Sequence, residues 1–539
     1  MRPKVVVAEP IAATALTLLR EHCRVDVALD AEAAELRERM RDAAGLVVRS
    51  GTQVDQQLIW AAPSLQVIGR AGIGVDNIDL AAATRAGVLV VNAPEANVIS
   101  AAEHTMALLL GQARRLPEAD AALRSGTWDR DSLEGVELHG KVLGVIGLGA
   151  VGTSVAQRAL AFGMQLMAYD PYVSPDRGRR IGVELTDDLG HLLAEADFIT
   201  VHLPLTRDTE GLLGKEALAK VKPGVRVVNT SRGRIIDEEA LAEAVRSGRV
   251  AGAALDVFAQ EPIGASPLLD LPQVVVTPHL GASTKEAQDK AGIAVAEAVV
   301  EALRGELVPS AVNVDMGRDV PERILPFLPV AEYLGHTFAA LAQGLPNELT
   351  VRAEGKLAEF PVRPLALATL KGTLASVSEG PISYVNAPLV AESRGLRVTE
   401  EASLEARDYL SVVRLSGVVA GATVSLSGTL VGKKGPVLVE ILDYEIELPF
   451  SRFMLIVRND DVPGVIGRIG TFLGDRDVNI ANMVVGRSPS TGEAAMMGLN
   501  LDRSLSEEEV AAFRGLANIT FAQFVDLSGH LPVQGSDSD

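Results

Sequence analysis

The chain has 539 residues, which is too long for a single hydrophobic core and predicts about three or four domains. Hydrophobic residues make up 47% of the sequence and charged residues 22%, which excludes a largely disordered protein. The 50 basic and 70 acidic residues give a formal net charge of -20, which repels nucleic acids and anionic membranes, so neither is an expected partner.

The sequence contains one cysteine, Cys23, which can form neither an intrachain disulfide nor a metal site made of several thiolates. The apolar run 5–8 near the N-terminus stops at Glu9 and Pro10, before the core of a secretion signal could form. No apolar stretch of the sequence reaches the roughly 18 residues that a membrane span needs. We therefore expect a cytoplasmic protein without a membrane span or a bound metal.

Two series of βα units are expected in the N-terminal part of the chain. From residue 4 to about residue 92, short β-branched runs alternate with helical patterns, which predicts a parallel sheet. The expected strands of this first unit are 5–8, 45–48, 67–68 and 88–91, and a long helix is expected over 98–115. The second series begins with a very apolar strand, as in a sheet covered on both faces. Its expected strands are 142–146, 166–170, 198–203, 225–230, 251–257 and 274–277.

A further helix is expected to begin at Ser283, because Glu286 three residues later completes a capping-box pattern, and to continue to Arg304. If this helix packs back on the first unit, the first domain is discontinuous and the second is inserted into it, with a cleft between them. We therefore predict an α/β arrangement of two doubly wound parallel-sheet domains. They are a discontinuous substrate-binding domain over 1–97 and 284–308, and an inserted domain over 98–283.

The C-terminal part predicts two further domains and a short tail. Four prolines between residues 309 and 329 mark a linker, and an intervening α+β domain is expected over 315–450. Within it, alternating stretches at 409–418 and 422–431 predict strands. Residues 451–531 follow the order strand, helix, strand, strand, helix, strand, which is a ferredoxin-like arrangement. Residues 532–539 are expected to form a flexible tail.

A glycine-rich segment, Gly147-Leu148-Gly149-Ala150-Val151-Gly152, follows the expected strand 142–146 and opens a helix. Asp170 lies 18 residues beyond Gly152, at the end of the next strand. Together these features indicate a Rossmann dinucleotide site, in which the helix N-terminus receives the pyrophosphate and the acid accepts hydrogen bonds from the ribose. The acid repels a 2′-phosphate, which favours NAD over NADP, whereas Arg177, Arg179 and Arg180 weaken that preference. A tight turn followed by an ordinary aspartate is the alternative interpretation.

Three polar residues follow the ends of successive expected strands: Arg232, Glu261 and His279. In open α/β sheets the ligand binds at this C-terminal edge, so the three side chains can converge. Hydride transfer between a 2-hydroxy acid and its keto acid needs a cation for the carboxylate and a group that exchanges the hydroxyl proton. Arg232 would hold the carboxylate, His279 would act as acid and base, and Glu261 would orient the imidazole and raise its pKa. For each residue taken alone, the alternative interpretation is an ordinary structural one: a surface arginine, a glutamate in a turn and a histidine in a loop.

At these motifs the chain resembles the D-isomer-specific 2-hydroxy acid dehydrogenase family, over about residues 4–305. The resemblance rests on the segment 147–152, on Asn229 to Gly233 continuing to Asp237, on 255–258 and on 278–281. It implies the three catalytic roles just described. It also implies an NAD site formed by Gly147, Gly149, Ala150, Val151, Gly152, Asp170, Leu203, Pro204, Thr230, Ser231, Arg232, Asp256, His279, Gly281 and Ala282.

The first domain carries more positive charge at its expected cleft than one carboxylate needs. Arg49 with Ser50, Arg70 and Asn97 lie at strand ends or in loops, and the turn Gly72-Ile73-Gly74 can offer backbone N–H groups to a carboxylate. A phosphate on a small anionic substrate would explain the additional arginines. Ordinary surface solvation of these arginines is the alternative.

These segments resemble the phosphoglycerate dehydrogenase branch of the family. The resemblance implies that Arg49 and Arg130 meet the phosphate, with Arg130 supplied by a neighbouring subunit, and that 72–74 and Asn97 seat the carboxylate. Ile73 departs from the hydroxyl residue common at its position. We therefore expect a homo-oligomer, a dimer or tetramer, that oxidises 3-phosphoglycerate with NAD at the start of serine biosynthesis. The alternatives are another D-2-hydroxy acid dehydrogenase, acting on glyoxylate or hydroxypyruvate, and a non-catalytic NAD-sensing scaffold.

The two C-terminal domains resemble the intervening domain and the ACT domain of the longer family members. ACT domains pair with copies of themselves and bind amino acids. Here Asp461 would hold an amino group, the turn at Gly464 and Val465 would present N–H groups to a carboxylate, and Asn479 would bridge ligand and partner. Serine is the expected effector, and a module that only oligomerises is the alternative.

Overall fold

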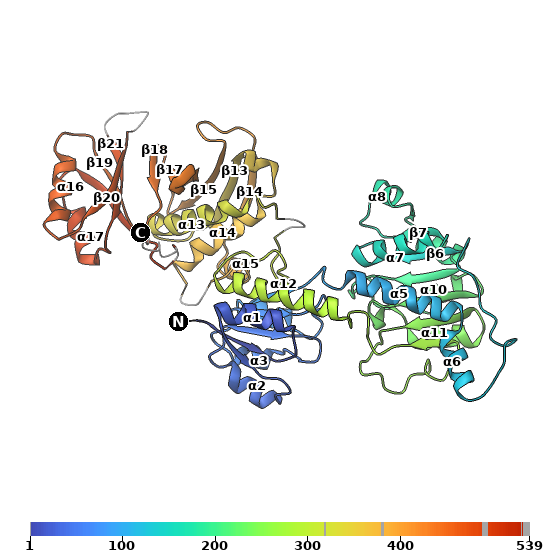
Figure 1. Ribbon diagram of the computed structural model, residues 1–539. Helices are drawn as coiled ribbons and strands as arrows, with labels where there is room; N and C mark the ends of the chain where they lie inside the picture. Colours follow the sequence, from blue (N-terminus) through green and yellow to red (C-terminus); the bar gives the residue numbers. More distant parts are fainter. Residues whose placement is uncertain (1, 317–319, 379–381, 488–493, 530, 532–539) are drawn as a thin grey trace.

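The computed structural model describes residues 2–316, 320–378, 382–487, 494–529 and 531, so the tail predicted at 532–539 lies outside the described residues. Within these ranges the chain forms four sheets with their associated helices. Figure 1 shows the first domain (blue) between the second domain (cyan and green) and the two C-terminal domains (yellow to red). The predicted fold class is confirmed: two parallel α/β domains precede a mixed domain and an antiparallel one.

The first domain is built on a five-stranded parallel sheet with the order β2-β1-β3-β4-β5, a doubly wound arrangement. Its central strands are buried except for Lys4 at the start of β1 and Arg70 at the end of β4, which explains their apolar sequence between those ends. The strands are β1 (Lys4–Val7), β2 (Arg24–Val27), β3 (Gly45–Val48), β4 (Val67–Arg70) and β5 (Leu89–Asn92). The helices are α1 (Ala13–His22), α2 (Ala33–Met40), α3 (Gln56–Trp60) and α4 (Leu80–Arg85).

Helix α12 (Lys285–Leu303) returns to the first domain and completes it. It packs on α1, β4 and β5, and a Cβ at Gly69 of β4 would lie 2.5 Å from Val295 of α12. This packing of α12 is what a discontinuous first domain requires, and the bounds of that domain stay a prediction. The predicted capping box at Ser283 is wrong by one residue, because Thr284 is the N-cap and its side chain accepts the N–H of Ala287 at 3.2 Å. Ser283 still belongs to the preceding turn, where its N–H donates to the carbonyl of Leu280 at 2.8 Å.

The second domain is a seven-stranded parallel sheet with the order β8-β7-β6-β9-β10-β11-β12. The strand order reverses between β6 and β9, and ligands of such sheets bind at this switch point, beyond the C-terminal ends of the strands. The strands are β6 (Val142–Ile146), β7 (Gln165–Tyr169), β8 (Glu184–Thr186), β9 (Phe198–Val201), β10 (Val225–Asn229), β11 (Val250–Leu255) and β12 (Val274–Val276). The helices are α5 (Val98–Ala113), α6 (Leu116–Arg124), α7 (Ala150–Ala161), α8 (Pro175–Arg180), α9 (Leu189–Glu195), α10 (Lys215–Lys220) and α11 (Glu238–Arg246).

The third domain is a six-stranded mixed sheet with the order β14-β13-β15-β16-β17-β18 and helices against one face. Only its β13/β14 pair is parallel. The strands are β13 (Glu348–Gly355), β14 (Arg397–Ser403), β15 (Ser411–Val419), β16 (Ala422–Val431), β17 (Gly435–Ile441) and β18 (Tyr444–Pro449). The helices are α13 (Leu328–Ala342), α14 (Arg363–Ala375) and α15 (Ala387–Ser393).

The fourth domain has the predicted order strand, helix, strand, strand, helix, strand, in an antiparallel sheet β20-β21-β19-β22. One face of this sheet packs on its own helices, whereas Met454, Ile456 and Met496 on the other face belong to the core of the third domain. The strands are β19 (Phe453–Asp460), β20 (Ile480–Arg487), β21 (Ala494–Leu501) and β22 (Ile519–Asp526), and the helices are α16 (Val465–Gly474) and α17 (Glu507–Arg514). Across the described ranges, every helix is too short or too polar to cross a membrane.

Candidate active site and cofactor loop

The glycine-rich loop between β6 and α7 has the shape of a phosphate cradle. Gly147 has a left-handed backbone with φ 95°, and a Cβ at Gly152 would lie 2.0 Å from the carbonyl oxygen of Gly147. Glycine at both positions is therefore required for the turn and for the close approach of α7 to β6. A Cβ at Gly149 would meet nothing within 4 Å, so this position opens to the space at the N-terminus of α7. The free N–H groups and the positive helix end there suit a pyrophosphate.

Asp170 lies against this loop, as the dinucleotide fingerprint predicts. It follows β7, the neighbour of β6, and its carboxylate accepts the N–H of Leu148 at 2.9 Å and that of Tyr172 at 3.0 Å. An acid held at this place is set to meet ribose hydroxyls. Arg177 and Arg179 lie downstream on α8, where Arg179 pairs with Asp176 of the same helix.

The other predicted cofactor residues follow the same edge of the sheet. Ala150 and Val151 begin α7, while Leu203 and Pro204 follow β9 and Thr230 and Ser231 follow β10. The Leu203 side chain lies over the turn at Gly147, and the Thr230 hydroxyl contacts that of Thr105 at 2.7 Å. The Ser231 N–H donates to Asn229 at 3.0 Å. Contacts of these residues with NAD stay a prediction.

The imidazole of His279 and the carboxylate of Glu261 form a hydrogen bond of 2.6 Å through Nδ1. The second carboxylate oxygen of Glu261 accepts the N–H of Phe258 at 3.0 Å, which fixes its orientation. The hydrogen bond from Glu261 raises the pKa of His279, although burial and the nearby Arg232 act against it. Burial works to raise the pKa of Glu261, but the hydrogen bonds from His279 and Phe258 outweigh it and lower that pKa. The His279 side chain is 48% exposed, so Nε2 is open to a ligand.

Asp256, at the end of β11, holds the loop that carries His279. Its buried carboxylate accepts the Thr277 hydroxyl at 2.6 Å and the N–H groups of Leu280 at 2.7 Å and Gly281 at 2.8 Å. His104 of α5 adds a fourth contact at 3.1 Å. These contacts make Asp256 a positioning residue for the loop. Its predicted place beside the nicotinamide, like that of Gly281 and Ala282, stays a prediction.

Arg232 reaches from the second domain to the first. Its Nε donates to Asp76 at 3.1 Å, and a Cβ at Gly74 would lie 2.2 Å from its Nη2. The guanidinium therefore lies directly on the turn 72–74 that is predicted to seat a carboxylate. It also acts on His279 by its charge, so the structure brings the predicted catalytic residues together with the substrate turn.

Two further arginines of the first domain stand near this guanidinium. Arg70 lies over Gly72, and burial lowers its pKa, with smaller contributions from the charges of Arg232 and Arg49. Asp76 and Glu9 act in the opposite direction. Arg70 and Arg232 therefore both lie on the turn 72–74, and Arg49 follows Val48, the strand partner of Arg70. The buried Nε of Arg70 has no hydrogen-bond partner in the described part of the chain. Such a cluster favours a ligand with more than one negative charge.

The remaining predicted substrate residues fall into two groups. Asn97 caps α5, and its buried Oδ1 has no hydrogen-bond partner among the described residues, which leaves it available to a ligand. Ser50 is exposed beside Arg49, and the carbonyl of Ile73 accepts from Asn92 at 2.6 Å. Arg130 lies instead in the exposed segment between α6 and β6 of the second domain, which projects from the molecule in Figure 1.

Sequence reasoning missed His104, Asp76 and Glu9. Glu9 follows β1 and accepts the N–H groups of Arg49 at 2.8 Å, Gly51 at 3.1 Å and Thr52 at 2.9 Å, so it shapes the loop that presents Arg49. Its place just beyond a strand end was a usable signal. His104 gives no such signal, because a single histidine within an apolar helix is typical of a core residue.

Three of the predicted effector residues, Asp461, Gly464 and Val465, lie at the start of α16, whereas Asn479 follows the C-terminal end of this helix. Gly464 is its N-cap with φ 89°, and Val465 is buried beneath it. Asp461 forms an ion pair with Arg487 at 2.9 Å, and Asn479 is exposed just before β20. The structure therefore brings Asp461 to the head of α16 but places Asn479 at the opposite end of the sheet.

Comparisons with known proteins agree with this geometry. Three family models match: "D-isomer specific 2-hydroxyacid dehydrogenase, NAD binding domain" over 106–281, "D-3-phosphoglycerate dehydrogenase intervening domain" over 323–442, and "ACT domain" over 453–518. D-3-phosphoglycerate dehydrogenase of Mycobacterium tuberculosis (strain ATCC 25618 / H37Rv) is 45% identical over 528 residues, which cover 98% of this chain and 99% of that protein. The chain belongs to the D-3-phosphoglycerate dehydrogenase family. A second relative of the same name, from Bacillus subtilis (strain 168), is 38% identical over 97% of this chain and 99% of its own length.

The family assignment fixes the cofactor and extends to solved structures. As a member of the D-3-phosphoglycerate dehydrogenase family, the chain carries an NAD-binding domain, which confirms the predicted cofactor. The crystal structure of the TT0316 protein from Thermus thermophilus aligns with a TM-score of 0.53 at 36% identity, over 57% of this chain and 99% of that one. The ACT domain identifies the C-terminal module as one that binds a ligand for regulation.

Proposed function

We propose that this family member oxidises 3-phosphoglycerate to 3-phosphohydroxypyruvate with NAD, the first step of serine biosynthesis. The observation that carries the proposal is that Arg70 and Arg232 both lie on the turn 72–74, with Arg49 on the loop after the neighbouring strand β3. The charge of Arg232 also acts on His279, which is hydrogen-bonded to Glu261. One guanidinium suffices for a carboxylate, and the others suit a doubly charged phosphate. Near full-length similarity to enzymes named D-3-phosphoglycerate dehydrogenase supports the same substrate.

In this proposal each residue has a defined task. NAD, when bound, supplies the acceptor for the hydride. Arg232 exchanges Asp76 for the substrate carboxylate, which also meets the N–H groups of the turn 72–74. His279 takes the C2 hydroxyl proton on Nε2, and Glu261 stabilises the imidazolium that results. Arg49 binds the phosphate, and this contact makes the site selective for 3-phosphoglycerate over hydroxy acids that lack a phosphate.

The test compares NADH formation by the full chain with 3-phosphoglycerate and with D-glycerate, which lacks the phosphate. We expect turnover of the first substrate and a much higher KM for the second. Arg49→Ala should raise the KM for 3-phosphoglycerate by about tenfold or more, since it removes a charge-assisted contact, and should barely change that for D-glycerate. Arg41→Ala, an exposed residue paired with Glu38 on another face, serves as the matched control. Absence of turnover with 3-phosphoglycerate refutes the proposed function, and equal effects on both substrates refute the role of Arg49.

The two alternative functions account for less of the site. A glyoxylate or hydroxypyruvate reductase has no use for three guanidinium groups at one cleft, because its substrate carries a single negative charge. A non-catalytic NAD sensor has no need for the hydrogen-bonded His279–Glu261 pair. The same assay separates them, since the reductase would prefer the unphosphorylated substrate and the sensor would turn over neither.

We infer that serine binds at the head of α16 and inhibits the enzyme. Its ammonium group would join Asp461, and its carboxylate would meet N–H groups at Gly464 and Val465. Asn479 lies at the other end of α16, so it would contact this ligand only across an interface with a partner subunit. Asp461→Ala should raise the serine concentration for half-inhibition by about tenfold or more. Asp475→Ala, at the other end of α16, is the control. Unchanged inhibition in Asp461→Ala contradicts this site.

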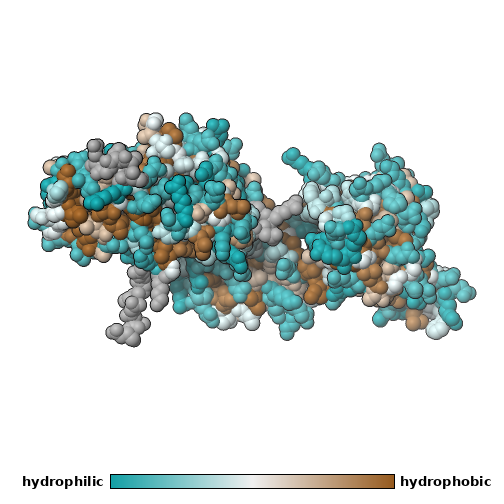
Figure 2. All heavy atoms as spheres, turned by 90° about the horizontal axis from the view of Figure 1, so that it is seen from above, coloured by the Kyte–Doolittle hydropathy of each residue, from teal (hydrophilic) through white to brown (hydrophobic). Residues whose placement is uncertain are grey.

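We also infer a cytoplasmic homo-oligomer, a dimer or tetramer. Apolar side chains lie between hydrophilic ones at both ends of the molecule in Figure 2. Among the exposed ones are Trp128 at 78% and Ile466 at 49%, in the second and fourth domains. Exposed apolar groups of this size are typical of subunit contacts. Light scattering on the purified chain tests this, and a monomer at micromolar concentration contradicts it.

A further inference from the structure

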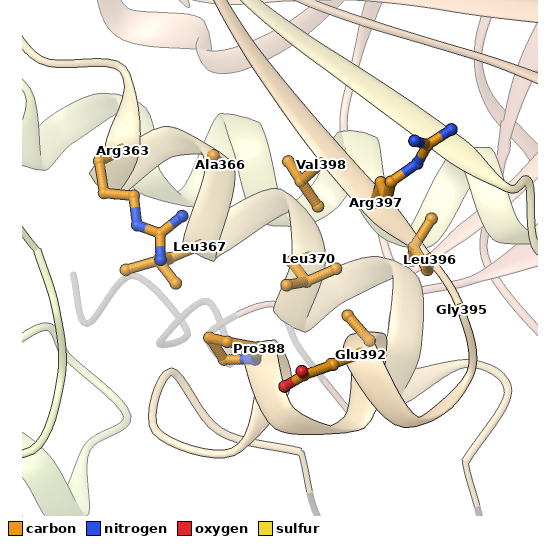
Figure 3. Close-up of a pocket in the computed structure, with 11 residues that line it drawn as sticks. Arg363, Ala366, Leu367, Leu370, Pro388, Glu392, Gly395, Leu396, Arg397 and Val398 are labelled. Carbon is orange, nitrogen blue, oxygen red and sulfur yellow. The ribbon is translucent and has the colours of Figure 1, made fainter.

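A cavity of about 430 Å³ lies in the third domain, between α14, α15 and the start of β14, away from the dehydrogenase cleft and the head of α16 (Figure 3). Its floor is apolar and is formed by Ala366, Leu367 and Leu370 of α14 together with Leu396 and Val398. Cavities of this size hold one small molecule, usually oriented by a few polar groups. The polar groups of this one stand at its rim.

The rim carries one guanidinium and one carboxylate. Arg363 uses Nε to donate to the carbonyl of Asp315 at 3.3 Å and Nη1 to donate to Glu400 at 3.0 Å, so it keeps further N–H donors. The carboxylate of Glu392 on α15 makes no hydrogen bond or ion pair within the described part of the chain. Figure 3 shows the Arg363 guanidinium directed toward Leu367 and the Glu392 carboxylate beside Pro388, whereas Arg397 points away.

We propose that this cavity binds an α-amino acid with an apolar side chain. Arg363 would hold the carboxylate, Glu392 would hold the ammonium group, and the floor would take the side chain. An inorganic anion or a phosphorylated metabolite is disfavoured, because the Glu392 carboxylate would repel it. A purely apolar molecule would leave both rim charges without a partner.

One wall of the cavity also contacts the first domain. The segment just before α15 holds the turn before β5, where the Ser383 hydroxyl donates to the carbonyl of Gly87 at 2.9 Å. A Cβ at Gly87 would lie 2.6 Å from the amide nitrogen of Asn386, the N-cap of α15. An occupant would therefore rest on the helix whose N-terminal end touches the substrate-binding domain.

Calorimetry on the full chain tests the proposal with L-leucine and L-phenylalanine as probes. The matched analogues of leucine are 4-methylpentanoate, which lacks the ammonium group, and 3-methylbutylamine, which lacks the carboxylate. We expect the amino acids to bind and each analogue to bind at least about tenfold more weakly, because each loses one charge-assisted contact. No heat with either amino acid at millimolar concentration, or equal binding of the analogues, overturns the proposal.

Variants assign the binding to this cavity. Glu392→Gln and Arg363→Gln should each weaken leucine binding about tenfold. Glu400→Gln breaks the ion pair of Arg363 but leaves its guanidinium, so it should retain binding. Asp461→Ala should also retain it, and loss of leucine binding in that variant places the ligand in the ACT domain and overturns the proposal.

Hydrogen exchange locates the ligand without any substitution. Leucine should slow amide exchange in peptides that cover 363–370 and 387–398, and should leave 461–479 unchanged. Protection confined to 461–479, or no protection of either cavity segment, contradicts this site. Both experiments measure amino-acid binding and not turnover. If this binding is absent, the proposed dehydrogenase activity still stands, and if that activity is absent, the proposed binding still stands.

Discussion

His279 has a left-handed backbone with φ 56°, which costs a non-glycine residue about 1 kcal/mol or more. Asp256 offsets this cost, because its carboxylate holds the residues on both sides of the histidine through Thr277, Leu280 and Gly281. The unusual conformation directs the imidazole toward Glu261 and the cleft. At the scale of the residue, the proposed catalysis would thus depend on a buried acid that positions the histidine and on an exposed acid that raises its pKa.

The raised pKa of His279 predicts the pH dependence of the reaction. Oxidation of the hydroxy acid needs a neutral imidazole, so kcat should fall as the pH drops through a pKa above the ordinary histidine value of about 6.5. Reduction needs the imidazolium, so its rate should fall as the pH rises through the same pKa. Glu261→Gln removes the charge that raises this pKa, and the acid limb of oxidation should move to lower pH by about one unit. Profiles of kcat against pH in both directions measure the shift.

Glu238→Gln is the matched control for that substitution. Glu238 accepts the N–H of Ala259 at 2.7 Å and the hydroxyl of Ser266 at 3.0 Å in the same loop region, without contacting His279. Its profile should keep the acid limb of the wild type. If the acid limb of the Glu261→Gln profile is unshifted, the Glu261 carboxylate does not control the pKa of His279.

The candidate site was predictable where it follows strand ends and unpredictable where it depends on distant partners. Arg232, Glu261 and His279 each lie in the loop that follows a parallel strand, and such loops share one edge of the sheet. The contact of Arg232 with Asp76 spans 156 residues, and that of His104 with Asp256 spans 152. No local pattern encodes these pairs, because they form only when the two domains and the helix between them are in place.

Among the elements, burial decides which ones the sequence predicts. Strands β6 and β16 occur at the residues predicted for them, because their apolar character contrasts with the turns around them. Strand β2 was missed, since it is a four-residue edge strand with its first and last residues exposed. The predicted N-cap of α12 differs from the observed one by one residue. Ser283 and Thr284 are both good N-cap residues, and the turn that precedes the helix in the folded structure decides between them.

That choice of N-cap is testable at the level of the helix. Thr284→Ala removes the acceptor for the Ala287 N–H and a 2.7 Å contact with the Ser100 hydroxyl. We expect the free energy of opening of α12 to fall by about 1–2 kcal/mol. Ser283→Ala, which keeps its backbone bond to Leu280, should change it by less than about 0.5 kcal/mol. Hydrogen exchange of the α12 amides measures both, and equal effects of the two substitutions contradict the assignment.

Over the whole molecule, the third and fourth domains share one core. Met454, Ile456, Met496 and Val525 of the ACT-domain sheet are buried in the same cluster as helices α13 and α14. The ferredoxin-like pattern in the sequence identifies the last domain but gives no sign that one face of its sheet is covered by another domain. The ACT domain is thus packed against its neighbour and is not tethered to it by a flexible linker.

Subunit assembly matters for the proposed reaction because Arg130 is predicted to bind the substrate of a neighbouring subunit. This residue lies in an exposed segment of the second domain, two positions from the 78% exposed Trp128, whereas Arg49 and Arg70 lie in the first domain. An arginine beside so exposed an apolar group fits a subunit contact better than a place in its own cleft. We therefore expect Arg130 to complete the substrate site of the partner.

Mixed oligomers decide whether Arg130 acts across the interface. Arg130→Ala, assayed at low 3-phosphoglycerate, and His279→Ala should each show little activity alone. In a symmetric dimer that pairs one chain of each kind, one of the two sites has both intact residues, so about half of the wild-type activity per dimer should return. Co-expression with two different tags and assay of the doubly purified fraction measure this directly. Activity no higher than that of the parents would place Arg130 in the site of its own subunit, because no mixed dimer would then hold an intact site.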